Sequence, residues 1–509
     1  MIDKFLNKVT MYRLTLYYLI GLVGIAALFG GLGLLPYTPA DIIISAIVAV
    51  ISSYLANYCF AWFFKAVTNS ESVFITALIL TLIIPVKLPH SLPFIIGASI
   101  LAMGVKYLVT VEKRHIFNPA AAAIAGIALL SPEYSATWWI GTPSMMPFVL
   151  IGGLAIVRKT RREDLVTTFL ATYALVVAIF AFLHTGSALS ILSILEKGIR
   201  QSALFFFAFV MLVEPLTSPP TKTLQRYFGG LVALLYSTPQ VRLFGIVFTP
   251  ETALCIGNIY SFLVSPQYRL VLALSERIQM TKDTFVFIFS RVNKFSFVPG
   301  QYMEWTLPHR DVDSRGNRRY FSLASSPTEA SPMLTVKFNN PSSSYKKALL
   351  SMEKGDEIIA SQLAGDFVLP KEYKKPLAFI AGGVGVAPFR SMIQYIIDNK
   401  LSVNIVLLFA NRHMDDVIFA DIFARAREYG IKTYYTLTDT TSIPPVWRGF
   451  TGHITSWMVQ EAIPDFEKRT FYISGPQLMV QETEKILKQM HIEKAKIMTD
   501  FFPGYKETK

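Results

Sequence analysis

Two glycine-containing motifs in the C-terminal half have the residue types and spacing needed to hold a nucleotide. The loop Gly382-Gly383-Val384-Gly385-Val386-Ala387-Pro388 follows the apolar run LAFIAG and precedes the helical pattern FRSMIQYIID. Glycines let the chain turn sharply and let backbone N–H groups approach a pyrophosphate at a helix N-terminus. The second motif, Ser474-Gly475-Pro476, ends the run TFYIS. It would present the nicotinamide end of the cofactor, with Ser474 facing the hydride path.

A third motif, Arg319-Tyr320-Phe321-Ser322-Leu323-Ala324-Ser325-Ser326, has the residue types that a flavin needs. Because alternate side chains of a strand share a face, Arg319 and Phe321 fall on one face and Tyr320 and Ser322 on the other. A flavin needs a cation for its phosphate, an aromatic surface beside its ring and a hydroxyl near its redox-active nitrogen. This motif supplies all three if the strand bends or twists. A structural strand with an edge arginine would show the same pattern.

The elements that must position these motifs change character along the C-terminal half. From about residue 266, alternating β-branched and aromatic residues predict strands of a small antiparallel β-barrel. After Pro376, strands alternate with helices, which is typical of a parallel α/β nucleotide-binding fold. We therefore expect a flavin-binding β-barrel over 266–372 and an NAD(P)H-binding α/β domain over 373–509.

Residues 1–265 have the composition of a membrane domain. Only 16% of the whole chain is charged, against about 25% in soluble domains, and this segment holds 17 of the 48 Lys and Arg residues. Ten apolar runs are candidate spans of a multi-pass α-helical domain. They cover roughly 14–34, 41–64, 72–86, 92–110, 117–131, 145–157, 165–184, 201–216, 226–237 and 245–264.

The basic residues of this segment indicate its orientation. With the N-terminus inside, thirteen Lys and Arg residues lie in inside segments and four outside, as expected for cytoplasmic loops. An even number of spans then places the C-terminal half in the cytoplasm, beneath a cell (inner) membrane. The basic residues lie between apolar spans rather than on one soluble face, so the net charge of +13 does not indicate nucleic-acid binding.

The membrane segment contains an internal repeat and two carboxylates within apolar runs. HIFNPAAAAIAG at 115–126 matches IVFTPETALCIG at 246–257 with an offset of 131, and five predicted spans between the copies indicate an inverted repeat. Chance similarity between apolar helices is the alternative. Glu214 and Glu251 each adjoin a proline, and a carboxylate in a span usually faces a cavity or a partner. If the spans are shorter than drawn, both carboxylates lie at an interface with water.

Metal cofactors are not expected. Two cysteines, Cys59 and Cys255, cannot hold a four-cysteine iron–sulfur cluster, and no Cys-x-x-Cys zinc spacing occurs. The three histidines of the membrane segment lie near span ends, so the facing pairs that ligate membrane haems are absent. An electron carrier in this segment would be organic, a flavin or a quinone.

Residues 266–509 resemble the ferredoxin–NADP reductase superfamily. Besides the three motifs, the resemblance includes Gly300-Gln301-Tyr302, Ser342-Ser343-Ser344-Tyr345-Lys346 and the terminal Asp500-Phe501-Phe502-Pro503-Gly504-Tyr505. It implies FAD, or FMN, as a cofactor and NAD(P)H as the electron donor. It also implies roles for site residues: Arg319, Tyr320, Phe321 and Ser322 at the flavin, Ser343 and Ser344 near its phosphates, Phe501 or Phe502 over its ring, and Gly382, Gly383, Gly385, Pro388, Gly475 and Pro476 at the nucleotide. Many relatives have cysteine where this chain has Ser474.

The segment from about residue 70 to residue 260 resembles the B subunit of sodium-translocating NADH:quinone reductase and the D subunit of Rnf complexes. The motifs His115-Ile116-Phe117-Asn118-Pro119-Ala120 and Glu214-Pro215-Leu216-Thr217-Ser218-Pro219 carry this resemblance. It implies a membrane flavin, with Asn118 and Thr217 as candidate contacts. The Ser/Thr-Gly-Ala-Thr sequence that attaches FMN in the family is absent, so such a flavin would be non-covalent.

These features together predict a membrane-bound NAD(P)H-dependent flavoprotein oxidoreductase. Electrons would pass from NAD(P)H through FAD, with Ser322 and Ser474 assisting, to a membrane flavin and then a quinone or a trans-membrane acceptor. The alternative is a redox-driven Na⁺ or H⁺ translocating subunit of a larger complex, with Glu214 in the ion path and other membrane subunits as partners. A non-redox transporter regulated by nucleotide is a third possibility. Arg412, which follows the run LLFAN, either meets a 2′-phosphate or faces solvent, so NADH and NADPH both stay open.

Overall fold

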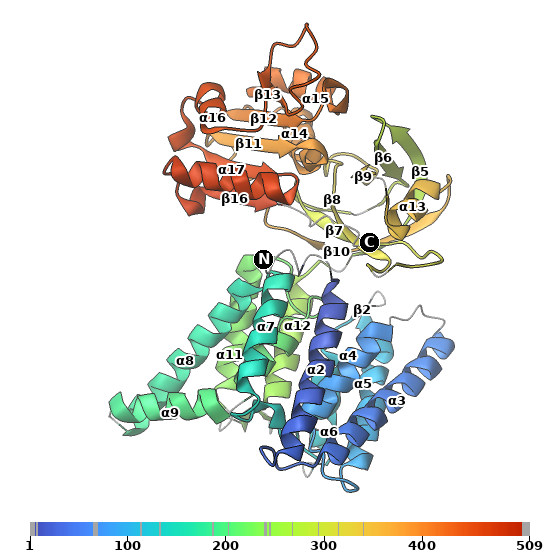
Figure 1. The fold of residues 1–509 in the computed structure, drawn as a ribbon, viewed down its shortest axis with the longest axis vertical. Coiled ribbons are helices and arrows are strands. Elements are labelled where there is room, and N and C mark those ends of the chain that lie inside the picture. Colours follow the sequence, from blue (N-terminus) through green and yellow to red (C-terminus); the bar gives the residue numbers. More distant parts are fainter. Residues whose placement is uncertain are drawn as a thin grey trace. The chain divides into compact units, whose positions relative to one another are not determined.

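The chain forms two compact units, Met1–Gln267 and Tyr268–Lys509. The computed structural model describes residues 6, 9–64, 70–111, 114–131, 134–185, 188–201, 203–238, 242–243, 246–266, 268–293, 295–313, 315–338 and 341–500. Figure 1 shows that the described part of the first unit is mostly helical, whereas the second combines two sheets with helices. The boundary lies two residues beyond the position at which the composition of the sequence changes.

The first unit consists of helices that overlap all ten apolar runs. They are α2 Met11–Gly31, α3 Pro39–Phe64, α4 Ser70–Ile83, α5 Leu92–Leu108, α6 Pro119–Leu130, α7 Met146–Thr160, α8 Glu163–Thr185, α9 Ala188–Gln201, α10 Leu204–Phe206 with the π-helical turn η2 Phe207–Met211, α11 Lys222–Tyr236 and α12 Pro250–Val264. Among the described residues, three helices are long and apolar enough to cross a membrane, namely Met11–Gly31, Pro39–Phe64 and Glu163–His184. The arrangement of ten spans therefore stays a prediction.

One helix of this unit was not predicted. The segment Ala188–Gln201, ALSILSILEKGIRQ, forms α9, which has polar and apolar faces rather than a continuous apolar run. Its apolar residues recur at helical spacing, as in a helix with only one apolar face. A search for long apolar runs does not detect such a helix.

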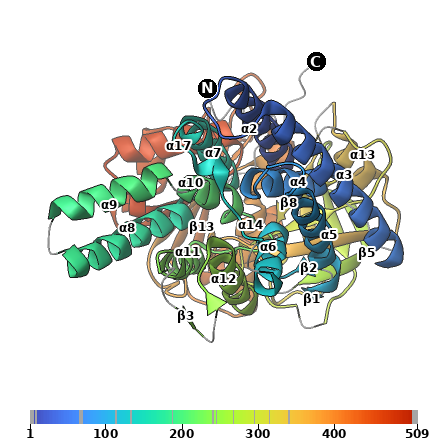
Figure 2. The same cartoon turned by 90° about the horizontal axis from the view of Figure 1, so that it is seen from below.

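The sequence repeat is also a repeat of secondary structure. The order α4, α5, a two-stranded ladder and α6 recurs as α10 with η2, α11, a second ladder and α12. The ladders pair β1 Thr110–Val111 with β2 Arg114–His115, and β3 Arg242–Leu243 with β4 Ile246–Val247. The helices α6 and α12 begin at prolines 131 positions apart, from 119 to 250, and pack against each other (Figure 2).

The first sheet of the second unit is antiparallel and holds the predicted flavin motif. Its order is β8-β7-β10-β5-β6-β9, and Trp305, Phe287 and Phe289 fill its core. Two residues beyond the end of β8, the N–H of Ala324 donates to the carbonyl oxygen of Met333, on β9, at 2.9 Å. Since the described residues form no ladder between these two edges, the sheet is a half-barrel rather than the predicted barrel. The strands are β5 Arg269–Gln279, β6 Thr284–Phe289, β7 Tyr302–Thr306, β8 Arg318–Ser322, β9 Met333–Lys337 and β10 Glu357–Ala364, with α13 Ser344–Ser351.

The second sheet is parallel, with helices on both faces, as predicted. Its order is β14-β13-β12-β11-β15-β16. The strands β11 and β12 are buried throughout, which their uninterrupted apolar sequences require. Side chains of α14 and α15 share a core with one face, and those of α16 and α17 with the other. The elements are β11 Leu377–Gly382, β12 Ile405–Asn411, β13 Ile431–Leu437, β14 Phe450–Thr451, β15 Thr470–Ser474, β16 Ile497–Asp500, α14 Ala387–Asp398, α15 Ala420–Arg425, α16 Ser456–Ala462 and α17 Gln477–Gln489.

A buried ion pair fastens the two sheets of this unit together. The guanidinium of Arg390, on α14, pairs with Glu329 and donates to the carbonyl oxygen of Ala324 at 3.1 Å. The next residue, Ser391, donates to the carbonyl oxygen of Ser325 at 2.6 Å. The segment that follows β8 is thereby held against the helix that follows the glycine loop.

Candidate functional site

The glycine loop lies where β11 passes into α14. A short 3₁₀ turn over Gly383–Val386 connects them, and Pro388 lies in the first turn of the helix. Gly383 has a φ of +52°, and a Cβ built there would have no atom within 4 Å, so this position faces open space. A left-handed backbone conformation with room in front of it favours glycine.

The loops that follow β11 and β15 touch through their backbones. A Cβ on Gly385 would lie 2.5 Å from the Cα of Gly475 and 2.6 Å from the carbonyl oxygen of Ser474. A Cβ on Gly382 would lie 3.1 Å from Cδ of Pro476. The two predicted nucleotide motifs therefore form one surface in which no side chain fits at these glycines.

This surface lies at the point where the strand order reverses. From β11 the chain continues to β12 on one side, whereas β15 joins β11 on the other. In open α/β sheets, ligands bind outside the carboxyl ends of the strands at such a switch point. The loops that carry Gly385 and Gly475 are the carboxyl-end loops of β11 and β15.

Two nearly buried polar side chains meet beside the switch point. The hydroxyl of Ser322, at the end of β8, lies 3.5 Å from Oδ2 of Asp500, to which it donates. Asp500 ends β16, where it is the register partner of Ser474 on β15. The end of β8 in the first sheet is thus joined to the strand next to Ser474 in the second. Phe501 and Phe502, predicted to cover the flavin ring, lie outside the described residues.

The start of β8 carries a cationic cluster beside the N-terminus of α13. The guanidinium carbon of Arg319 lies 4.9 Å from the ring centre of Tyr345, and Nη1 donates to the carbonyl oxygens of Arg315 and Gly316. Ser343 caps α13 by accepting the N–H of Lys346 at 3.2 Å. A helix N-terminus beside guanidinium groups suits a phosphate.

Asp313 brings this cluster together. Its carboxylate accepts the N–H of Ser344 at 2.9 Å and pairs with Arg315 at 2.6 Å. Burial alone would raise the pKa of Asp313, but the hydrogen bonds from Arg315 and from the backbone hold it well below the usual range. Burial, together with the charges of Arg319 and Arg315, lowers the pKa of Lys346 to about 8. Two guanidinium groups and Lys346 thus lie within one small region, and such a group of cations suits a phosphate.

The two ends of β8 are spaced for one flavin. Arg319 and Ser322 are three residues apart on the strand, or about 10 Å along it, a distance that a ribityl chain bridges. Phe321 packs at 6.1 Å from Tyr345, on the Arg319 side of the strand. Tyr320 packs edge-on at 5.8 Å against Tyr302, on the other side, and is 37% exposed. The residue types of a flavin site are therefore present on β8, with Arg319 and Phe321 on one face and Tyr320 and Ser322 on the other.

Arg412 follows β12, at the carboxyl edge of the same sheet. Its side chain is 72% exposed and lies 3.6 Å from Asp439, which follows β13. The sequence alone did not indicate this carboxylate as a partner.

In the first unit, the predicted polar residues of both copies of the repeat meet. Glu214 accepts hydrogen bonds from the amide of Asn118 at 2.9 Å and from the hydroxyl of Thr217 at 3.1 Å. The ring of His115 lies 3.7 Å from the same carboxylate. Asn258, which sequence reasoning missed, accepts the N–H of Asn118 at 2.8 Å and donates to the carbonyl oxygen of Thr217 at 3.0 Å.

Glu251, the other carboxylate of the apolar runs, is not in this cluster. Its carboxylate accepts the indole N–H of Trp138 at 2.7 Å, and it lies in the first turn of α12. Acidic side chains are stabilised at this position by the helix dipole.

Comparisons with known proteins agree with the C-terminal assignment. Residues 379–485 match the family model described as the oxidoreductase NAD-binding domain. The chain is 27% identical over 219 residues to the glycine betaine monooxygenase reductase subunit of Chromohalobacter salexigens, covering 42% of this chain and 58% of that protein. It is 26% identical over 215 residues to a flavohemoprotein of Oceanobacillus iheyensis, covering 41% and 52%.

The chain thus spans little more than half the length of these curated relatives. Among solved structures, the Amycolatopsis cytochrome P450 reductase GcoB is similar with a TM-score of 0.42 and 22% identity, over 47% of this chain and 72% of that one. The C-terminal region of this chain is therefore similar to ferredoxin–NADP reductase-like oxidoreductases, and its residues 379–485 match an oxidoreductase NAD-binding domain.

Proposed function

We propose that the chain is a membrane-bound NAD(P)H-dependent flavoprotein oxidoreductase. The observation that carries this proposal is the hydrogen bond from Ser322 to Asp500, the strand neighbour of Ser474, beside the paired glycine loops. A flavin supplies the ability to accept a hydride and to release its two electrons singly. The protein's part is to hold donor and acceptor rings in contact and to keep water away from them.

Each motif has a separate task in this proposal. Arg319, Ser343 and Ser344 hold the flavin phosphates, and Tyr320 and Phe321 flank the flavin. Gly382, Gly383, Gly385 and Pro388 receive the nucleotide pyrophosphate, while Gly475 and Pro476 border the nicotinamide. Ser322 and Ser474, oriented by Asp500, lie where the hydride crosses. FAD fits better than FMN in this proposal, because the resemblance to ferredoxin–NADP reductases favours it.

The first unit receives the electrons in this proposal. Its three long apolar helices support insertion in a bilayer. We place the membrane part in the cell membrane and the reductase unit in the cytoplasm, where reduced nicotinamide nucleotides occur. The acceptor is a quinone, or a carrier across the membrane, reached through a non-covalent flavin near Asn118 and Thr217.

Ion translocation is the second candidate function, favoured by one observation. Glu214 is a carboxylate within a predicted span, and its partners come from both copies of the repeat. Such a carboxylate is typical of ion and proton paths in membrane proteins. NADH-dependent uptake of Na⁺ or H⁺ into vesicles that contain the protein would support this function over simple quinone reduction.

The primary test uses the purified full chain. Its bound flavin is identified by mass, and NADH or NADPH is then added without oxygen. We expect the absorbance of the flavin band to bleach, and Arg319→Ala to purify with less flavin. A colourless protein, or a flavin that neither donor bleaches, would refute the proposal and favour a transporter regulated by nucleotide. Reduction of a quinone in proteoliposomes then tests transfer through the first unit.

A further inference from the structure

The carboxyl ends of β12 and β13 hold a compact group of charged side chains. The carboxylate of Asp439 lies 3.6 Å from Nε of Arg412 and 3.8 Å from Nε2 of His413. It also accepts the backbone N–H of Thr441 at 3.0 Å and the hydroxyl of Thr441 at 2.5 Å. The carboxylate is therefore held by two hydrogen bonds from Thr441, with Arg412 and His413 beside it. The proposed hydride transfer uses none of these residues.

The proposed function determines which part of the dinucleotide reaches this group. If the nicotinamide lies beside Ser474, at the end of β15, the remainder must cross the glycine loop towards β12 and β13. Strands lie about 4.8 Å apart, so β13 is roughly 14 Å from β15. In nucleotide-binding sheets an acidic side chain near this edge accepts the ribose 2′-hydroxyl, whereas an arginine accommodates a 2′-phosphate.

A carboxylate and an arginine both lie at this edge, and the carboxylate is better placed to contact the ribose. The Asp439 side chain is 18% exposed, whereas that of Arg412 is 72% exposed and extends into solvent. The hydrogen bonds from Thr441 lower the pKa of Asp439, so it is ionised at neutral pH. Arg412 lies beside the Asp439 carboxylate and would have to move away from it in order to bind a phosphate.

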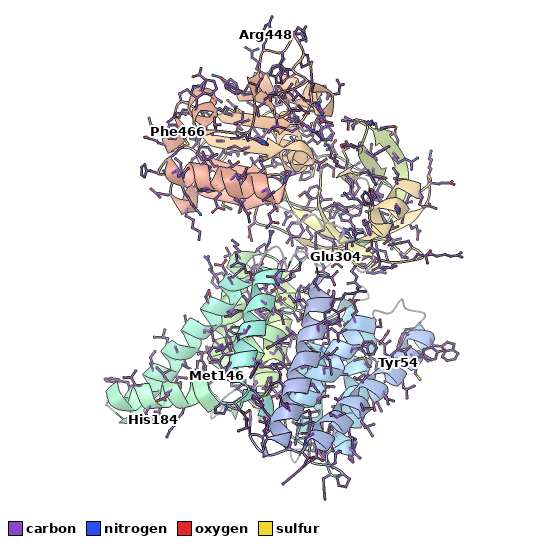
Figure 3. The ribbon with its side chains drawn as sticks, in the orientation of Figure 1. Tyr54, Met146, His184, Glu304, Arg448 and Phe466 are labelled. Carbon is purple, nitrogen blue, oxygen red and sulfur yellow. The ribbon has the colours of Figure 1, made fainter. Side chains whose placement is uncertain are left out.

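The other charges at this edge do not favour a phosphate either. Asp415 and Asp416 lie on the short turn after His413, and Asp416 accepts the N–H of His413 at 3.1 Å. Arg448, at the outer tip of the loop after β13 (Figure 3), donates to carbonyl oxygens of its own loop. A 2′-phosphate, with a charge of about −1.5 to −2, would meet the carboxylate of Asp439 here.

We propose that this chain selects NADH over NADPH, and that Asp439 determines the preference. The carboxylate accepts the 2′-hydroxyl of the adenosine ribose. It excludes the 2′-phosphate both by repulsion and by occupying Arg412. This inference rests on the proposed function, since it assumes that a nicotinamide dinucleotide is the electron donor.

The test compares both donors on the full chain. We expect kcat/KM for NADH to exceed that for NADPH by about tenfold or more, the factor that one modest charge interaction produces. Asp439→Asn should shift the ratio towards NADPH by about tenfold, through KM rather than kcat. Adding Arg412→Ala to that variant should remove the gain, because the released guanidinium is what binds the phosphate.

A matched control separates this specific effect from a general change of charge. Asp415→Asn removes the same charge from the neighbouring turn and should leave the NADH-to-NADPH ratio within about twofold. If it shifts the ratio as much as Asp439→Asn, the assignment to Asp439 is wrong. A wild-type preference for NADPH, or equal use of both donors, would overturn the inference as a whole.

A binding measurement keeps this inference separate from the proposed function. Calorimetric titration with 5′-AMP and with 2′-AMP needs no electron transfer. The wild-type protein should bind 5′-AMP more tightly, and Asp439→Asn should gain affinity for 2′-AMP. If neither donor bleaches the flavin, the proposed function fails, yet the nucleotide preference is still measured. If the flavin bleaches but 2′-AMP binds more tightly than 5′-AMP, only the present inference fails.

Discussion

The hydroxyl of Ser322 and the carboxylate of Asp500 are 3.5 Å apart, although 178 positions separate them in the chain. Asp500 is also the register partner of Ser474. One buried carboxylate therefore connects the end of the flavin strand with the end of β15. In the proposed function, this connection lies where a nicotinamide and a flavin ring would meet.

Replacing either partner should slow hydride transfer without displacing the flavin. Ser322→Ala and Asp500→Asn each remove part of the contact that positions the reacting rings, and misplacement of this kind is costly. We expect the rate of flavin reduction, followed by anaerobic stopped-flow absorbance, to fall by about tenfold to a hundredfold. Ser351→Ala, on the exposed last turn of α13, should not change it. Equal rates in all variants would remove Ser322 and Asp500 from the site.

Gly385→Ala should damage the nucleotide site, because the new Cβ would meet backbone atoms of Gly475 at 2.5 Å and 2.6 Å. Backbone cannot rotate away as a flexible side chain does, so we expect a loss of about 1–3 kcal/mol in stability. The KM for the nucleotide should rise together with this loss.

Gly355→Ala, in the turn before β10, is the comparison for that variant. It adds the same methyl group into open space and away from the proposed nucleotide site, at the cost only of a positive φ, or about 1–2 kcal/mol. Thermal unfolding and steady-state kinetics of both variants measure the difference. A nucleotide KM that rises as much in Gly355→Ala as in Gly385→Ala would show that the contact between the loops is unimportant.

The sequence predicts the local elements of the reductase unit well, for a physical reason. Strands buried on both faces need uninterrupted apolar residues, so β11 and β12 are evident in LAFIAG and NIVLLFAN. A glycine loop between such a strand and a helix is typical of a nucleotide-binding site. The predicted order of strand, loop and helix around Gly382 is therefore confirmed.

Contacts between distant residues could not be predicted in the same way. Asp500 lies beside Ser322 because Arg390 and Ser391 fix the α/β sheet against the half-barrel, and no local pattern records that packing. Likewise the motifs that contain Asn118 and Glu214 were each evident in the sequence, but neither indicated that the two side chains bond to each other. The pairing of Arg412 with Asp439 also joins two different strands.

Flavin affinity should fall as the pH rises through about 8, the pKa of Lys346. Burial and the charges of Arg319 and Arg315 depress this pKa in the flavin-free protein. A bound phosphate would raise it, so binding above pH 8 takes up a proton and weakens as protons become scarce. Fluorescence titrations with FAD between about pH 6.5 and 9.5 measure the dependence. Lys346→Arg keeps its charge over this range and should give a flatter profile.

The Arg390–Glu329 pair should contribute strongly to the stability of the reductase unit. The side chains are only 7% and 27% exposed, and removing one partner of a buried pair costs about 3–5 kcal/mol. Glu329→Gln should therefore lower the temperature at which unfolding releases the flavin, which is measured as a rise in flavin fluorescence. The exposed pair Lys375–Glu372, with side chains 74% and 71% exposed, provides the control. Glu372→Gln should have no measurable effect, since solvent screens an exposed ion pair and leaves it little influence on stability.

Glu214→Gln should impair the activity that depends on the first unit and leave the activity of the reductase unit unchanged. The amide cannot carry the charge that Asn118, Thr217 and His115 surround, so any step in the first unit that needs this charge will fail. We expect quinone reduction by the full chain to fall by about tenfold or more, as expected for a charge with an electrostatic role. Reduction of a soluble dye by NADH should continue, because the reductase unit has its own site. Glu251→Gln, whose amide oxygen can still accept the Trp138 indole N–H, should retain both activities. If Glu214→Gln also retains both, the Glu214 cluster has a structural role, and electrons reach their acceptor by a route that avoids it.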